Sequence, residues 1–237
     1  EFLKKTSRPN YKPALPKLSG KDVVLDFPFH EGAGNLRSVS SRRQSGNSNM
    51  LIWGRVDGRQ SLTSNGGSYN NYRVSFDSTS FDFSDGSLII SFKPTDGSVG
   101  YQFLFNNRGT GNNNNEIDIY SLNTQNKVRI DIYNGTSKQT LDVPNLSFNS
   151  WNTLVVTFGS DLKASLNGND FVTYSSITMP SVNSSTRYIL GNSDDRYGMQ
   201  GSVDHFSLHN KQISGIEAKQ LHKNIYKDYS LDYIIPN

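Results

Sequence analysis

Residues 116–142 read EIDIYSLNTQNKVRIDIYNGTSKQTLD, and no other stretch of the chain says as much about its fold. Apolar and polar residues alternate strictly along 116–121 and again along 127–133, which is the period of a strand with one buried face. The second run ends at Asn134-Gly135, a pair that favours the tight turn of a β-hairpin, and a further run follows at 137–142. The stretch therefore predicts antiparallel strands joined by short turns.

Short β-branched and aromatic runs with turn residues between them continue in both directions from this hairpin. Asn167-Gly168 marks another tight turn, and residues 31–49 are expected to form a long loop. About a dozen strands at this spacing are typical of an all-β antiparallel sandwich. Beside the three above, strands are expected at 22–29, 50–56, 73–76, 87–93, 101–105, 152–158, 161–166, 170–174, 186–190 and 201–209.

A single helix is expected near the end of the chain, at 214–223. Ser214 can cap it, and Glu217 three residues later completes a capping box. We expect three parts: an extended basic N-terminal arm at 1–20, a jelly roll at 21–212, and the helix with a tail at 213–237.

Composition excludes several classes of protein. The 237 residues contain no Cys, so disulfide frameworks and thiolate metal sites are excluded. No apolar run approaches the roughly 18 residues of a membrane-spanning helix. Only 34% of the residues are hydrophobic, but 13 Phe and 12 Tyr can supply a core because each aromatic side chain buries a large area.

Charge is concentrated at the start of the chain. Residues 1–20 hold five Lys or Arg and one Glu, which gives +4, whereas the other 217 residues hold 19 basic and 20 acidic residues. Three Pro keep this arm extended. Five cations without a folded basic patch make a weak footprint for nucleic acid, so we expect neither a nucleic-acid nor a membrane partner. A solvated tail and an arm that lies along a partner subunit both remain open.

An ordered series of motifs resembles the laminin-G-like branch of the concanavalin A-like jelly rolls. The resemblance implies the jelly-roll fold, and it leaves activity open because this fold hosts lectins, enzymes and structural modules. The motifs are WNTLVVTF at 151–158, LNG at 166–168, ILG at 189–191, MQGSVDHFSLH at 199–209 and ISGIEAKQL at 213–221. The closing stretch from Asn224 to Pro236 is similar to that of laminin-G-like proteins of tailed bacteriophages, with Ile225 where those have Pro.

Two neighbouring runs place six candidate ligand-binding residues on one sheet face. Alternation puts Glu116, Asp118 and Tyr120 on one side of the first strand. Alternation likewise puts Arg129, Asp131 and Tyr133 on one side of the second. If the strands pair, the face displays two Tyr, three acids and one Arg, which suits a glycan because aromatic rings stack on sugars and charged groups bond hydroxyls. An ordinary solvated face with cross-strand charge pairs remains the alternative.

The same strand resembles the Glu-x-Asp-x-Glu strand of laminarinase-type β-glucanases, which share the fold. Tyr120 stands where those enzymes have their third carboxylate, so the expected proton donor is missing. We therefore expect no catalytic residues and no enzymatic activity.

Metal and cofactor signals are weak. Asp194 and Asp195 are the candidate ligands for Ca²⁺, but two clustered acids fall short of the six to eight oxygens that calcium takes. His205 and His209 share a strand face at a spacing too long to chelate one ion. The sequence predicts neither a metal site nor a cofactor.

Taken together, these features favour a non-enzymatic virion structural protein. Such a protein would decorate or cement a capsid or tail at the virion surface, as a homo-oligomer held to other subunits by its arm and tail, with a jelly roll that binds surface glycans. The alternatives are a carbohydrate-binding module of a secreted polysaccharide-degrading enzyme and a divergent glycosidase or lyase.

Overall fold

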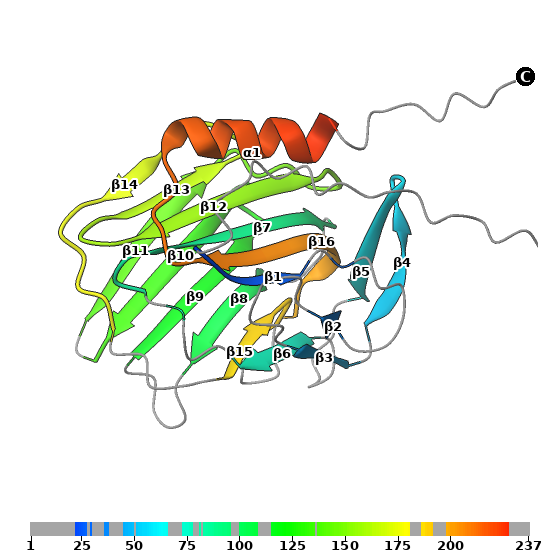
Figure 1. Cartoon of the computed structure of the whole chain (residues 1–237), viewed down its shortest axis with the longest axis horizontal. Coiled ribbons are helices and arrows are strands. Elements are labelled where there is room, and N and C mark those ends of the chain that lie inside the picture. The colour runs from blue at the N-terminus through cyan, green and yellow to red at the C-terminus, as the bar shows by residue number, and fades with distance from the viewer. Residues whose placement is uncertain are drawn as a thin grey trace, which may run out of the picture.

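The computed structural model describes residues 22–27, 29, 36–37, 45–49, 51–65, 73–77, 81, 83–95, 100–108, 115–135, 137–180, 186–191 and 198–227. The expected N-terminal arm at 1–20, the tail beyond residue 227 and the Ca²⁺ candidates Asp194 and Asp195 lie outside them. Sixteen strands and one helix occur in the described part (Figure 1). The strands form two antiparallel sheets, which confirms the all-β sandwich.

One sheet, here called sheet A, has the strand order β14-β13-β12-β7-β16-β5-β4, and β1 also pairs with β16. Its strands are β1 (Val23–Phe27), β4 (Ile52–Val56), β5 (Arg59–Asn65), β7 (Gly86–Pro94), β12 (Asn152–Phe158), β13 (Leu162–Leu166), β14 (Val172–Tyr174) and β16 (Gln200–His209). The other, sheet B, has the order β11-β10-β9-β8-β15-β6-β3-β2. Its strands are β2 (Leu36–Arg37), β3 (Ser45–Asn49), β6 (Arg73–Asp77), β8 (Tyr101–Arg108), β9 (Asn115–Leu122), β10 (Lys127–Asn134), β11 (Lys138–Pro144) and β15 (Thr186–Ile189).

The turns follow the chemistry of their residues. β10 and β11 pair from Tyr133↔Lys138 onward, which confirms the hairpin, and Gly135 takes a φ of 91°. Asn167 and Gly168 take φ values of 57° and 71°, as a two-residue hairpin turn requires. Asp57 and Gly58 do the same between β4 and β5.

Two expectations about the first third of the chain were wrong. Residues 31–49 were expected to be a loop, yet β2 and β3 lie within them. β3 pairs with β6, so long-range pairing overrides a Gly-, Ser- and Asn-rich composition. β5 was also missed, although the Asp57-Gly58 pair before it was a visible turn signal.

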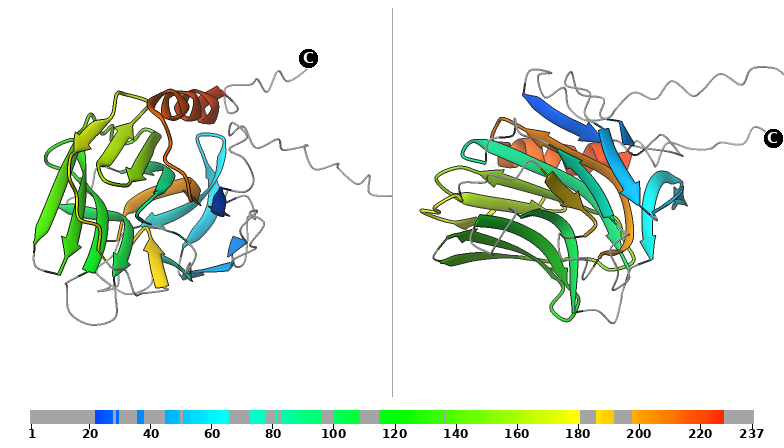
Figure 2. Two further views of the ribbon diagram at one scale, coloured as in Figure 1. Left: turned by 60° about the vertical axis from the view of Figure 1, so that its left-hand side comes forward. Right: turned by 90° about the horizontal axis from the view of Figure 1, so that it is seen from below.

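The two sheets lie face to face (Figure 2). The hydrophobic core lies between them. Alternate residues of β7 and β12, such as Ile90 and Val156, point into it, and so do Ile119 and Ile130 from sheet B. Phe27, Phe76, Phe105 and Phe206 lie in ring contact at centroid separations between 5.6 and 5.9 Å. The aromatic-rich composition therefore does supply the core, as expected.

Helix α1 (Gly215–Lys227) covers the outer face of sheet A. Ala218 and Leu221 pack with Ile89 and Val155, which alternate with core residues on β7 and β12. The expected capping box is present. The backbone N–H of Glu217 donates to Ser214 Oγ at 3.3 Å, and the Ser214 N–H donates to Glu217 Oε2 at 2.8 Å. The helix begins where predicted and runs four residues further.

Trp151, which precedes β12, is buried. Its ring is 6% exposed and the guanidinium of Arg59 lies 4.7 Å from its centroid. Arg59 also donates to Asp204 Oδ2 at 3.0 Å, deep under the helix side of sheet A.

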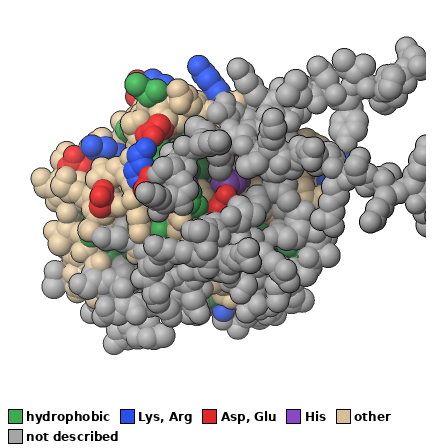
Figure 3. Space-filling model, in the orientation of Figure 1, with side chains coloured by type: hydrophobic (Ala, Val, Ile, Leu, Met, Phe, Trp, Pro, Cys, Tyr) green, Lys and Arg blue, Asp and Glu red, His purple; other side chains and the backbone are tan. Residues whose placement is uncertain are grey.

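Within the described residues, no helix has the length and hydropathy of a membrane span. Lys, Arg, Asp and Glu side chains lie intermixed on the part of the surface that Figure 3 colours.

Candidate functional site

The six residues expected to share a face do so. β9 and β10 pair antiparallel with the register Tyr120↔Arg129, Asp118↔Asp131 and Glu116↔Tyr133. The alternate residues point the other way, into the core; they are Ile117, Ile119, Val128, Ile130 and Ile132. The polar residues therefore lie together on the outer face of sheet B.

Their exposure differs from the expectation of a solvent-facing display. Glu116 and Asp118 are each 8% exposed, Tyr120 is 6% exposed and Asp131 is 1% exposed. Only Arg129 and Tyr133 are half-buried. β8 and β11 flank the pair on both sides. Tyr101 and Phe103 of β8 contact the Tyr120 ring, and Lys138 of β11 contacts Asp131. Four of the six residues therefore form a buried floor.

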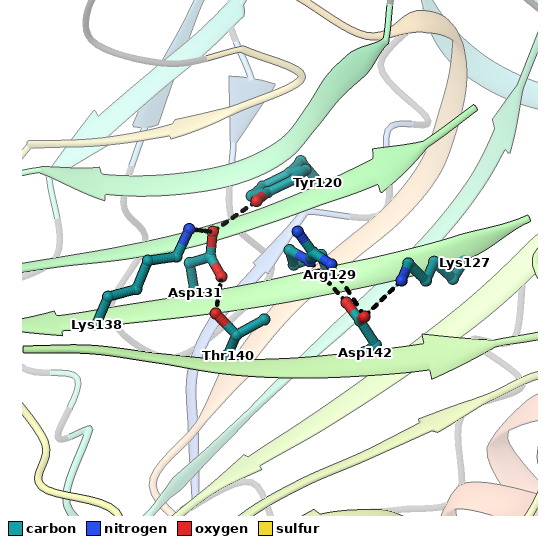
Figure 4. Close-up of polar contacts among 7 residues, drawn as sticks. All are labelled: Tyr120, Lys127, Arg129, Asp131, Lys138, Thr140 and Asp142. Carbon is teal, nitrogen blue, oxygen red and sulfur yellow. Dashed lines mark hydrogen bonds and ion pairs between the residues drawn. The ribbon is translucent and has the colours of Figure 1, made fainter. Parts of the chain in front are cut away.

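The Asp131 carboxylate is contacted by three side chains from β9 and β11 (Figure 4). Tyr120 Oη donates to its Oδ2 at 2.5 Å, and Thr140 Oγ1 donates to its Oδ1 at 2.7 Å. Lys138 Nζ lies 2.6 Å from Oδ2. Burial and the bond to Asp131 raise the pKa of Tyr120 far above its ordinary value, so this phenol stays a donor.

A second carboxylate group lies beside it on β11. Arg129 donates two parallel hydrogen bonds to Asp142, from Nε to Oδ1 at 2.7 Å and from Nη2 to Oδ2 at 3.0 Å. Lys127 Nζ adds a contact to Oδ2 at 2.5 Å. The hydrogen bonds of these two cations lower the pKa of Asp142 to about 2. The Asp142 carboxylate is thus ionised at neutral pH, and it remains within reach of solvent together with Arg129 and Lys127.

The other end of the floor holds a carboxyl pair. Asn106 Nδ2 on β8 donates to Glu116 Oε1 at 2.9 Å and to Asp118 Oδ1 at 2.6 Å. Burial, followed by the nearby Glu116, raises the pKa of Asp118 well above its ordinary value. Asp118 therefore holds its proton to a higher pH than an exposed Asp does.

Tyr101 was not among the site residues expected from the sequence, yet among the described residues it is the most exposed aromatic residue of this face. Tyr101 on β8 is 47% exposed, and its ring meets the Tyr120 ring edge-on at 5.5 Å and 71°. The Phe103 ring also packs against Tyr120, with centroids 5.4 Å apart. Tyr101 and Phe103 alternate at the start of an expected strand, so the sequence indicated that they share a face. It did not indicate that this strand pairs with β9.

The accessible part of the face is named the rim below, and it surrounds the floor formed by Glu116, Asp118, Tyr120 and Asp131. The rim consists of Tyr101, Lys127, Arg129, Tyr133, Lys138 and Asp142. It offers two phenol rings beside donors and acceptors, which is the chemistry that holds a sugar ring and its hydroxyls. Among the described residues, no three His, Asp or Glu side chains gather as a metal site.

Comparison with known proteins identifies the fold only. No family model and no curated protein match the sequence. The binding domain of botulinum neurotoxin serotype G superposes with a TM-score of 0.69 at 10% identity, over 85% of this chain and 51% of that one. The binding domain of Paraclostridial Mosquitocidal Protein 1 gives 0.68 at 14% identity, over 87% and 53%.

A third structure, of botulinum neurotoxin type C, superposes with a TM-score of 0.66 at 13% identity, over 87% of this chain and 52% of that one. Cell entry of that toxin depends on interaction with two ganglioside molecules. The chain described here spans about half the length of each of these domains. These similar structures are β-sandwich binding domains, and at such identities the likeness extends to the fold.

Proposed function

We propose that this chain is a non-enzymatic glycan-binding β-sandwich whose ligand lies on the rim of sheet B. The observation that carries the proposal is Tyr101, an aromatic ring 47% exposed beside a cluster of charged side chains. A tyrosine ring in this position offers an accessible aromatic face on which a sugar ring can stack.

The floor supports this function by holding the rim in place. Tyr120 packs against Tyr101, and Asp131 holds Lys138, so two rim side chains rest on buried partners. Side chains that are ordered before the ligand arrives lose less entropy on binding. Solved structures of similar fold include binding domains. Cell entry of the type C toxin depends on interaction with two ganglioside molecules, and this chain covers 52% of the length of that toxin's structure. These facts favour a binding role, without locating it.

Binding to a glycan array before and after Tyr101→Ala tests the proposal. Loss of one stacked ring should weaken binding by about 1 kcal/mol, which is roughly fivefold, and leave the thermal unfolding midpoint nearly unchanged. Ile52→Ala on β4 of sheet A is the matched control, because Ile52 is 53% exposed and lies in the other sheet. Equal binding by the Tyr101 variant would remove the rim as the site.

Tyr120 now has a different expected role from the one its sequence position indicated. Its ring is buried against Tyr101 and Phe103, so Tyr120→Ala should reduce stability together with binding. Tyr133→Ala remains the better probe of a direct contact, because that side chain reaches solvent.

A glycosidase remains the competing function, favoured by the carboxyl pair on β9. Glu116 and Asp118 are both close to Asn106, but both are buried, and Tyr120 replaces the third acid of the strand. We expect no release of reducing ends from β-glucans. Release that disappears in Glu116→Gln would establish the enzyme and overturn the binding role.

The ends of the chain favour a finer assignment, as a structural component at a virion surface. The first 20 residues carry a charge of +4 and three Pro, and the last ten carry two Tyr and three large aliphatic residues. Such ends suit contacts to other subunits of an assembly, with the sandwich bound to surface glycans. A carbohydrate-binding module of a secreted enzyme would instead be found free in the medium.

Immunogold labelling of particles and supernatant from the source culture separates these two locations. Regular label on virus-like particles would support the virion assignment. Label confined to soluble material would support the secreted module.

A further inference from the structure

Charges on the outer face of sheet B are layered by depth. The acids of the floor are withdrawn from solvent, since Glu116, Asp118 and Asp131 are at most 8% exposed. The cations of the rim reach it, with side-chain exposures of 41% for Lys138, 26% for Arg129 and 19% for Lys127. A ligand that approaches the rim therefore meets these three cations and Asp142, whose side chain is 35% exposed, before it meets the three buried acids.

The rim offers more donors than its own carboxylate can use. Asp142 is its one acid in the described residues and takes two N–H groups from Arg129 and one from Lys127. A guanidinium carries five N–H donors and an ammonium carries three. A planar anion can meet the outward edge of a guanidinium with two parallel hydrogen bonds.

The same pairing of cation and aromatic ring recurs on the far side of the floor. Tyr188 on β15 lies opposite Asn106 and Ser75 in the register, and so on the outer face of sheet B. The guanidinium of Arg73 on β6 lies 4.4 Å from the Tyr188 ring centroid. Lys138 Nζ similarly lies 5.4 Å from the Tyr133 ring centroid. Cations beside rings thus flank the buried acids on both sides.

We infer that the rim selects acidic glycans, those whose sugars carry a carboxylate or a sulfate, over their neutral counterparts. The inference rests on the proposed glycan-binding function and names its ligand class. The sugar ring stacks on Tyr101, while the acid group accepts hydrogen bonds from Arg129 and Lys138. A neutral sugar can stack on the same ring, but it has no acid group to accept hydrogen bonds from Arg129 and Lys138, which then remain hydrated.

The test is an array that holds neutral glycans beside their sialylated, uronic-acid and sulfated counterparts, read at low and at high salt. We expect roughly tenfold tighter binding of the acidic member of each pair, because hydrogen bonds between charged groups are the stronger ones. The preference should shrink in about 0.5 M NaCl, where charges are screened within a few ångströms.

Variants assign the preference to the rim. Arg129→Gln and Lys138→Gln should each remove most of the preference for acidic glycans. Lys138→Arg should keep the preference, because it retains the positive charge beside Asp131. Lys163→Gln is the matched control, because Lys163 lies on β13 of sheet A with a side chain 37% exposed. Preference unchanged in both Gln variants would overturn the inference.

Three further outcomes are distinguishable. Equal binding of neutral and acidic partners, lost in Tyr101→Ala, would overturn the acidic selectivity and leave the proposed function intact. No binding to any glycan would remove both. Polyglutamate bound as tightly as the acidic glycans, with no effect of Tyr101→Ala, would overturn the inference by showing attraction between a basic chain and any polyanion.

Discussion

At the scale of single residues, the floor of sheet B depends on how completely its polar atoms are paired. Asp131 is 1% exposed and holds hydrogen bonds from Tyr120 and Thr140 with an ion pair from Lys138. When a buried carboxyl group loses one hydrogen-bond partner, its desolvation penalty remains uncompensated. Removal of any one partner of Asp131 should therefore lower the free energy of unfolding.

Tyr120→Phe removes one of those partners while keeping the ring. We expect a loss of about 1–3 kcal/mol in the free energy of unfolding, because a buried acceptor is left with one bond fewer. Urea unfolding measures the loss. Tyr133→Phe on the neighbouring strand is the control and should cost less than about 0.5 kcal/mol, since that side chain lies nearer solvent. Equal small losses in both would mean that the bond to Asp131 contributes little.

At the scale of secondary structure, α1 is held by one face only. Leu221 is fully buried against the outer face of sheet A, whereas Ile216 on the same helix is 72% exposed. Leu221→Ala should lower the free energy of unfolding by about 2–5 kcal/mol, as removal of a buried Leu side chain does.

Ile216→Ala is the matched control on the same helix. It should change stability by at most about 0.5 kcal/mol, because the side chain is already in water. Thermal unfolding of both variants compares them directly. Similar losses in the two would show that α1 does not dock as the structure has it.

At the scale of the whole molecule, we expect the stability of the fold to depend on pH through β16, the strand with which β1 pairs. His209 on β16 is 2% exposed, pairs in register with Val23 of β1, and contacts Ser207 Oγ at 2.9 Å. Burial, helped by the neighbouring His205, lowers the pKa of His209 to about 4 from 6.5. Between these two values the unfolded chain binds more protons than the folded one.

The free energy of unfolding is therefore unaffected by His209 above pH 6.5. It decreases as the pH falls from 6.5 towards 4, by about 3 kcal/mol in all, because the unfolded chain takes up the proton first. Burial raises the pKa values of Asp26, Asp118 and Asp204, and these groups act in the opposite sense. The difference between the native chain and His209→Gln isolates the histidine. Urea midpoints from pH 7.5 to 4.5 should fall less steeply in the variant; parallel curves would exclude His209 as the cause.

The floor of the candidate site was predictable in its membership and not in its depth, whereas of the six rim residues only Arg129 and Tyr133 were expected from the sequence. Alternation along β9 and β10 placed Glu116, Asp118 and Asp131 on one face, and the register confirms that they are neighbours. Their burial follows from β8 and β11, which lie on either side. Tyr101 entered the site for the same reason, because β8 pairs with β9 across a bulge at Phe103–Phe105.

Local patterns of the chain were enough to determine the class of fold. The period of two, the Asn-Gly turns and the capping box of α1 each depend on residues a few positions apart, and their geometry does not need the rest of the molecule. Only the tertiary structure decided which polar residues became a floor and which a rim. The exposure of a side chain depends on strands far away in sequence that pack beside it, and no local period encodes those neighbours.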